Sequence, residues 1–67
     1  MITITNAKFS HYAESGVAVN VYEIAGLSTD SKPVTADVGN GSSFIEMDTS
    51  KVYFYDEAGH TWREWGA

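Results

Sequence analysis

The sequence contains no cysteine, only one proline and no long run of apolar residues. Without cysteine the chain cannot form disulfide bonds, so covalent cross-links contribute nothing to its stability. No apolar stretch approaches the roughly 20 residues that a membrane-spanning helix needs, and the N-terminus lacks the basic and apolar regions of a signal peptide. We therefore expect a protein that resides in the cytoplasm and has no membrane partner.

Basic residues are also scarce. The chain has four Lys and Arg against nine Asp and Glu, which gives a formal net charge of −5. A surface of this sign repels a phosphate backbone, so we expect no direct contact with nucleic acid. The acidic residues are scattered along the chain rather than gathered in one run.

No group of residues resembles a catalytic or metal-binding motif. His11 and His60 lie far apart, and neither stands at the spacing of metal ligands. Glu46 and Asp48 fall on one side of a predicted strand, but a solvated strand face with Asp48 beside Lys51 explains them better than a catalytic carboxylate pair. We expect no enzymatic activity, no metal and no cofactor.

A chain of 67 residues forms one domain at most, residues 1–67. Ordering costs roughly 1.5 kcal/mol per residue, so burial must offset about 100 kcal/mol and leaves a thin margin. Domains of this size often gain stability from disulfides, metals or oligomerisation. Because disulfides are excluded and no metal is expected, self-association or docking on a larger partner is the expected source of stability.

The most regular pattern lies towards the C-terminus, where β-branched and aromatic residues predict paired strands over 43–48 and 51–56. Thr49 and Ser50 form a two-residue loop in this interpretation, although they suit the positive φ of such turns poorly. The pairs that follow are Met47 with Val52, Ile45 with Phe54 and Asp48 with Lys51. A three-residue loop is the alternative, and it would mix the two faces of the sheet.

Alternation along these strands separates two faces of the predicted sheet. One face is apolar and is the expected core, with the members Ile45, Met47, Val52 and Phe54. The other face is wetter and carries Phe44, Glu46, Asp48, Lys51, Tyr53 and Tyr55.

A second turn over 57–59 ends in Gly59, where a type I turn with a bulge needs a left-handed residue. It leads into a third predicted strand over 60–65, which completes a meander. The continued register pairs Phe54 with Trp62 and Tyr53 with Arg63. Trp62 then joins the apolar face, and Arg63 makes a cation–π contact of about 0.5–1 kcal/mol on the other face.

The N-terminal part adds strands to what we expect to be an all-β fold, a small antiparallel sheet. Residues 2–5 alternate apolar with polar and predict a short strand. Residues 6–15 fit either a strand that returns from a turn at Asn6, which is favoured, or two helical turns. Residues 17–24 predict a strong strand, since valines and flanking glycines disfavour a helix. Residues 26–43, rich in small polar residues, form a long loop within the domain.

Aromatic residues are concentrated in the predicted meander, where six of the nine fall between positions 44 and 65. A contiguous aromatic surface on a small protein marks a protein interface more often than chance. The candidate partner surface on the wetter face consists of Phe44, Tyr53, Tyr55, Arg63 and Trp65. Two alternatives stay open: strands within residues 1–24 cover this face, or its rings stack on sugars.

Three segments of the chain form a recognisable set. They are Gly-Leu-Ser-Thr-Asp-Ser-Lys-Pro at 26–33, a Phe-Ile-Glu-Met-Asp-Thr-Ser-Lys-Val-Tyr hairpin at 44–53, and an aromatic closing strand with Thr61 and Trp62. Together they resemble a family of small proteins encoded among the structural genes of bacteriophages and prophages. The similarity covers residues 22–65 and includes no catalytic motif. Ser50 stands where the family usually has glycine, and residues 1–16 lie outside the resemblance.

The resemblance implies a non-enzymatic accessory protein of a phage or prophage virion, located in the virion or in the cytoplasm of the host bacterium. In this hypothesis the aromatic sheet face contacts further copies of the chain, as a homo-oligomer, and other phage structural proteins. The alternative is a small acidic phage inhibitor that mimics nucleic acid and blocks a host nucleic-acid-binding enzyme. Its phosphate mimics would be Glu46, Asp48, Asp56, Glu57 and Glu64.

Overall fold

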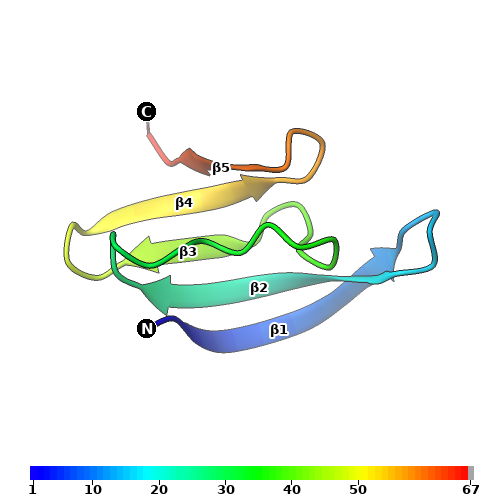
Figure 1. Cartoon of the computed structure of the whole chain (residues 1–67), viewed down its shortest axis with the longest axis horizontal. Coiled ribbons are helices and arrows are strands. Elements are labelled where there is room, and N and C mark those ends of the chain that lie inside the picture. Colours follow the sequence, from blue (N-terminus) through cyan, green and yellow to red (C-terminus); the bar gives the residue numbers. More distant parts are fainter. Residues whose placement is uncertain (67) are drawn as a thin grey trace.

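The computed structural model describes residues 1–66, which form one five-stranded β-sheet with the strands in sequence order (Figure 1). The strands are β1 (Thr3–Tyr12), β2 (Ala18–Gly26), β3 (Ser43–Glu46), β4 (Lys51–Asp56) and β5 (Thr61–Glu64). The pairs β1–β2, β3–β4 and β4–β5 are antiparallel. The prediction of a small all-β fold that ends in a three-stranded meander is confirmed.

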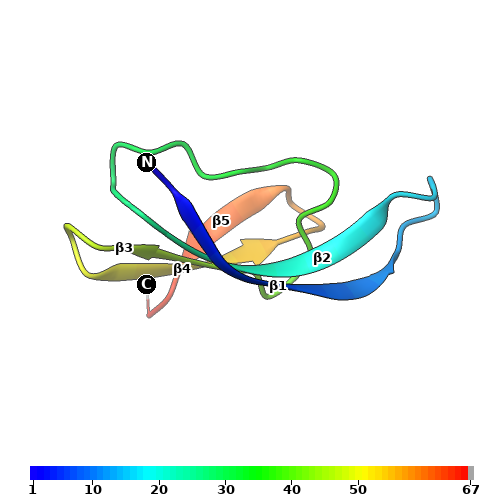
Figure 2. The same cartoon turned by 90° about the horizontal axis from the view of Figure 1, so that it is seen from below.

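The pairing of β2 with β3 is parallel and is the exception in the sheet. A parallel pair cannot be joined by a tight turn, because the chain must first return to the end of the sheet where β2 began. Residues 27–42 make this return as a right-handed crossover along one side of the sheet (Figure 1, Figure 2). The side beneath the crossover is named the covered face, and the opposite side is named the open face.

The predicted loop over 26–43 corresponds to this crossover, which is extended and pairs briefly with β2. Val38 forms an isolated parallel bridge with Asn20, and the Gly39 N–H donates to the Asn20 carbonyl at 2.8 Å. Glycine is required here, since a Cβ on Gly39 would lie 2.8 Å from Cγ1 of Val19. The crossover thus lies tightly against the sheet.

The core lies mainly between the crossover and the covered face. The buried hydrophobic side chains are Ile24, Phe44 and Tyr55 of the sheet, Val38 of the crossover, and Val19, which lies against Gly39. On the open face, residues 1–66 provide no second layer, so Ile45 and Phe54 keep 47% and 40% of their surface exposed. The prediction that Ile45, Met47, Val52 and Phe54 form the core is wrong, because the crossover covers the opposite side.

The β3–β4 hairpin has a longer loop than predicted. Its loop spans residues 47–50, and Ser50 takes the left-handed conformation with a φ of 62°. The observed pairs are Glu46 with Lys51, Ile45 with Val52 and Phe44 with Tyr53. This register differs from the predicted one by two positions. Because side chains alternate with period two, the slip leaves the members of each face together, as predicted.

The β4–β5 hairpin also closes with a four-residue loop, residues 57–60, and here the slip is a single residue. His60 holds the left-handed conformation with a φ of 51°, a role that the prediction gave to Gly59. The observed pairs are Tyr55 with Trp62 and Phe54 with Arg63. A one-residue slip moves every side chain to the other face. Trp62 therefore joins the covered face, and the predicted cation–π contact between Tyr53 and Arg63 does not form.

β1 is a continuous strand of ten residues, so the strand alternative holds for the first part of residues 6–15. Neither helical turns nor a reversal at Asn6 forms there. The pairing of β1 with β2 is irregular between Ile4 and Asn6 and again between Phe9 and His11. Such bulges bend a strand and interrupt its ladder of hydrogen bonds. β2 confirms the strand predicted over 17–24 and continues to residue 26.

The left-handed residue of the β3–β4 loop provides a first test. A side chain at positive φ costs roughly 1–2 kcal/mol relative to glycine, which exceeds the entropy that glycine adds to the unfolded chain. Ser50→Gly is therefore expected to raise the free energy of unfolding by about 0.5–1 kcal/mol in urea denaturation. Ala58→Gly, at a loop position without positive φ, is the control and should lower it. Equal effects of the two substitutions would contradict the argument.

Candidate functional site on the open sheet face

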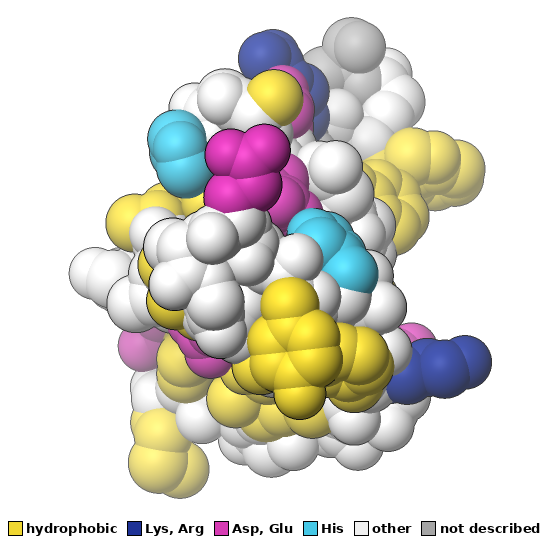
Figure 3. Space-filling view, turned by 90° about the vertical axis from the view of Figure 1, so that its right-hand side faces the viewer, with side chains coloured by type: hydrophobic (Ala, Val, Ile, Leu, Met, Phe, Trp, Pro, Cys, Tyr) yellow, Lys and Arg dark blue, Asp and Glu magenta, His cyan; other side chains and the backbone are white. Residues whose placement is uncertain are grey.

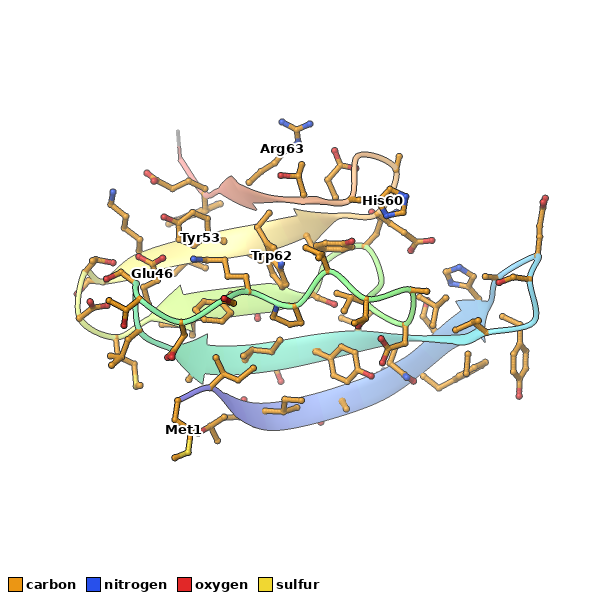
Figure 4. The ribbon with its side chains drawn as sticks, in the orientation of Figure 1. Met1, Glu46, Tyr53, His60, Trp62 and Arg63 are labelled. Carbon is orange, nitrogen blue, oxygen red and sulfur yellow. The ribbon has the colours of Figure 1, made fainter. Side chains whose placement is uncertain are left out.

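Trp62 attaches the crossover to the centre of the covered face (Figure 4). Its indole Nε1 donates a hydrogen bond to the Pro33 carbonyl at 2.9 Å. Its ring packs edge-on to Phe44 with centroids 6.0 Å apart, and on Tyr55 with centroids 5.1 Å apart. Aromatic pairs of this kind stabilise a fold by about 0.5–1.5 kcal/mol beyond the area they bury. The centre of the covered face is therefore a packed layer of aromatic side chains beneath the crossover.

An ion pair closes one end of the covered face. Nζ of Lys32 lies 2.6 Å from Oε2 of Glu46, and the two side chains are only 18% and 5% exposed. The same ammonium group lies over the rings of Phe44, at 4.8 Å, and Tyr53, at 4.3 Å. Oγ1 of Thr49 donates to Oε1 of Glu46 at 2.6 Å. The hydrogen bonds from Lys32 and Thr49 hold the pKa of Glu46 below its usual value.

Two further carboxylates, those of Asp48 and Asp30, accept hydrogen bonds at the start of the crossover. Ser28 donates to Asp48 through Oγ at 2.6 Å and through its backbone N–H at 3.0 Å, which lowers the pKa of Asp48. The amino group of Met1, at 2.9 Å, and the Leu27 N–H, at 2.8 Å, bind Asp30 and lower its pKa. These acidic side chains serve the fold, because each one ties the crossover to another part of the chain.

The five residues of the predicted partner surface do not share one exposed surface. Phe44 and Tyr55 are buried, with 0% and 4% of their surface exposed, and Tyr53 is half-buried. Arg63 and Trp65 are exposed, and alternation along β5 places them on the open face. The aromatic face is covered, but the alternative in which strands within residues 1–24 cover it is wrong. Its cover is the crossover.

The open face carries an uninterrupted apolar row across neighbouring strands. Ala25 of β2 pairs with Ile45 of β3, which pairs with Val52 of β4. Trp65 follows β5 and extends the row, since its N–H donates to the Val52 carbonyl at 2.8 Å. Ile45 is 47% exposed and Trp65 is 71% exposed. These four residues are named the apolar row.

The adjacent row on the open face has charged residues at its ends. It runs from Glu23 of β2 through Ser43 and Phe54 to Arg63 of β5. Nε of Arg63 donates to Oδ2 of Asp56 at 3.0 Å, which lowers the pKa of Asp56. Within residues 1–66, the carboxylate of Glu23 and the terminal nitrogens of Arg63 make no hydrogen bond.

A smaller hydrophobic cluster lies at the tip of the β1–β2 hairpin. Phe9 and Tyr12 are 53% and 70% exposed, and their ring centroids are 5.1 Å apart. Figure 3 shows hydrophobic side chains gathered at this end of the molecule, close to histidine and acidic side chains. Nε2 of His11 lies 3.8 Å from Oε2 of Glu57. This cluster joins only two side chains, whereas the open face extends over four strands.

The described part of the chain offers little other chemistry. Residues 1–66 enclose no pocket and contain no group of three or more His, Cys, Asp or Glu side chains placed to hold a metal ion. Nor does this range include a helix of the length and apolar character that crossing a membrane requires. The open face is therefore the candidate functional site.

Sequence reasoning missed the open face because it assigned the alternating apolar residues of 43–56 to the core. A useful signal was present in the length of residues 27–42. A connection of a dozen or more residues between two strands is typical of a parallel crossover, which has to cover one face of the sheet.

Acid titration tests the role of the carboxylates. Glu46, Asp48 and Asp30 have lowered pKa values in the folded chain, so below pH 5 the folded chain binds fewer protons than the unfolded chain. Their contribution to stability is complete at neutral pH, above the unfolded pKa of about 4, and is lost as the pH falls through the folded values. We expect the thermal midpoint followed by circular dichroism to fall steadily below about pH 4.5.

Lys32→Met isolates the ion pair within this pH profile. The methionine keeps an apolar stem against Phe44 and Tyr53 but leaves Glu46 unpaired, so the pKa of Glu46 rises. Glu46 then no longer binds fewer protons in the folded chain than in the unfolded chain, so stability should fall less steeply on acidification than in the wild-type protein. Lys32→Met/Glu46→Gln removes the titrating group and should likewise show a flatter profile than the wild-type protein. Identical profiles for wild type and Lys32→Met would show that the pair has no such role.

Comparison of the chain with protein-family models, with characterised proteins and with solved structures finds no match. A functional proposal therefore has to rest on the open face, its neighbouring contacts and the motifs of the sequence.

Proposed function

We propose that this chain is a non-enzymatic accessory protein of a bacteriophage or prophage virion that acts through protein–protein contacts of its open face. The observation that carries the proposal is the apolar row of Ala25, Ile45, Val52 and Trp65, in which Ile45 and Trp65 are exposed and Ala25 and Val52 are half-buried. A contiguous apolar patch on a small protein marks an interaction surface, because exposure of such a patch to water is unfavourable.

The shape and chemistry of the open face suit a protein partner. The face is a sheet surface without a pocket, whereas small molecules bind in concave sites. Burial of Ile45, Phe54 and Trp65 by a partner contributes about 1 kcal/mol or more for each side chain. Polar and charged residues flank the apolar row, which is the usual arrangement of a protein interface with an apolar centre and a polar rim.

The phage assignment rests on the resemblance of segments 26–33 and 44–53. These two segments contact each other in the fold, for example through the ion pair between Lys32 and Glu46. The motif residues thus hold the crossover on the sheet and form the scaffold. In this proposal the scaffold is shared among such proteins, and the open face provides the partner contacts.

The alternative, an acidic inhibitor that mimics nucleic acid, receives less support from the positions of its acids. A mimic needs free carboxylates along one surface, so that its potential complements a basic groove. The proposed mimics are already engaged within the chain: Glu46 with Lys32, Asp48 with Ser28, Asp56 with Arg63, Glu57 with Asn40 and Glu64 with Lys51. They also lie at both ends of β4 rather than in one row.

Purified phage particles provide the test. Particles released from the bacterium that encodes the chain should contain it, as measured by quantitative mass spectrometry after density-gradient purification. Ile45→Glu places a charge in the apolar row and is expected to lower incorporation about tenfold or more, since a buried unpaired charge opposes association. Val34→Glu is the matched control, because Val34 is a 56% exposed apolar residue of the crossover. It should leave incorporation unchanged.

The proposal fails if particles lack the chain while the folded protein accumulates in the cell. It also fails if Ile45→Glu and Val34→Glu are incorporated equally, because the open face would then have no part in the contact.

A further inference from the structure

We infer that the partner of the open face is a second copy of this chain, packed face to face about a two-fold axis that runs along the strands between β3 and β4. This inference rests on the proposed function, since it names the occupant of the same surface. It is supported by the fit of the apolar row to itself and by the charges beside that row.

The apolar row is self-complementary about this axis. Ile45 and Val52 are paired neighbours on β3 and β4, so the axis passes between them. Rotation places β3 over the partner's β4 and β2 over the partner's β5. Ile45 then faces the partner's Val52, and Ala25 faces the partner's Trp65. A small side chain opposite a large one lets two sheets interdigitate at their usual spacing of about 10 Å.

The charges of the adjacent row are complementary about the same axis. Glu23 of β2 faces the partner's Arg63, and Arg63 faces the partner's Glu23, so the dimer contains this pair twice. Arg63 already binds Asp56 through Nε at 3.0 Å, and its terminal nitrogens remain for a second carboxylate. A guanidinium group has five donors and can serve two carboxylates at once.

The same charges disfavour the other simple arrangement of two facing sheets. A two-fold axis across the strands would stack β2 on the partner's β2 and β5 on the partner's β5. In that arrangement Glu23 cannot face the partner's Arg63, and an axis through their own row would bring Glu23 onto the partner's Glu23. Like charges that face each other across an interface suppress association. Of the two arrangements, only the axis along the strands therefore pairs Glu23 with Arg63.

With the axis along the strands, β2 to β5 of each chain overlap, whereas β1 lies outside the contact. The contact is therefore smaller than the sheet plane spanned by the two longer extents of the molecule, 36 and 23 Å between Cα atoms. Pairing through the outer edge of β1 is less favourable, because two bulges and Lys8 interrupt that edge.

Analytical ultracentrifugation of the full chain tests the dimer and its axis. The wild-type protein is expected to be dimeric. In a dimer of Glu23→Arg chains, the new arginine of each chain faces the partner's Arg63. In a dimer of Asp56→Asn/Arg63→Glu chains, the new glutamate of each chain faces the partner's Glu23. Each variant should therefore raise the dissociation constant about tenfold or more. An equal mixture of the two variants restores both pairs: one is reversed, with arginine at position 23 facing glutamate at position 63, and the other is the native pair of Glu23 with Arg63. The mixture should therefore dimerise nearly as well as wild type, while Asp56→Asn alone should behave as wild type.

A measurement on the wild-type protein needs no substitution. Isotope-filtered NMR on a mixture of labelled and unlabelled chains should show contacts from the methyl groups of Ile45 to the partner's Val52. The methyl groups of Val34, on the crossover, should show none. Contacts from Val34 in place of those from Ile45 would overturn the proposed surface.

The remaining outcomes separate this inference from the proposed function. A chain that stays monomeric at its highest soluble concentration, or charge variants that do not rescue each other on mixing, would overturn the dimer. A monomer that still enters phage particles through Ile45 would overturn the dimer and leave the proposed function in place. A dimer that is absent from phage particles would support the inference and refute the phage assignment.

Discussion

The parallel pairing of β2 with β3 is the constraint on which the rest of the structure depends. It obliges residues 27–42 to cross the sheet, because parallel neighbours cannot be joined by a turn. The crossing segment buries one face, where Trp62 binds the Pro33 carbonyl and packs on Phe44 and Tyr55. The opposite face keeps its apolar row exposed. One strand pair therefore determines both the core and the candidate site.

The crossover has almost no regular secondary structure, and side chains hold it in place. Lys32 joins it to Glu46 between two aromatic rings, and Asp48 binds Ser28 at its start. A buried ion pair adds little net stability compared with apolar packing, but it is costly to break, because one charge is then left unpaired. Such contacts give the crossover a single position on the sheet. The residues that make them lie within segments 26–33 and 44–53.

The strands of the C-terminal half could be predicted, because runs of β-branched and aromatic residues define them. The loops could not, since Ser50 and His60 adopt a left-handed conformation that is uncommon for residues other than glycine. The resulting one-residue error in the second hairpin moved Trp62 to the wrong face. Burial was not predictable from alternation alone, because both faces carry large side chains: Phe44, Tyr53 and Tyr55 on one, and Ile45, Val52 and Phe54 on the other. Only the path of the crossover distinguishes the two faces, and it depends on contacts between residues distant in sequence.

The sheet also consists of two halves with separate local contacts. The β1–β2 hairpin and the β3–β5 meander each form from antiparallel neighbours in the sequence, whereas four residue pairs between β2 and β3 join them. Local contacts cost less loop-closure entropy than this long-range joint. If the crossover detaches and β2 separates from β3, both halves stay intact, and the edges of β2 and β3 that were paired become exposed. Two chains in this state can exchange halves, with residues 27–42 as the hinge of a domain swap.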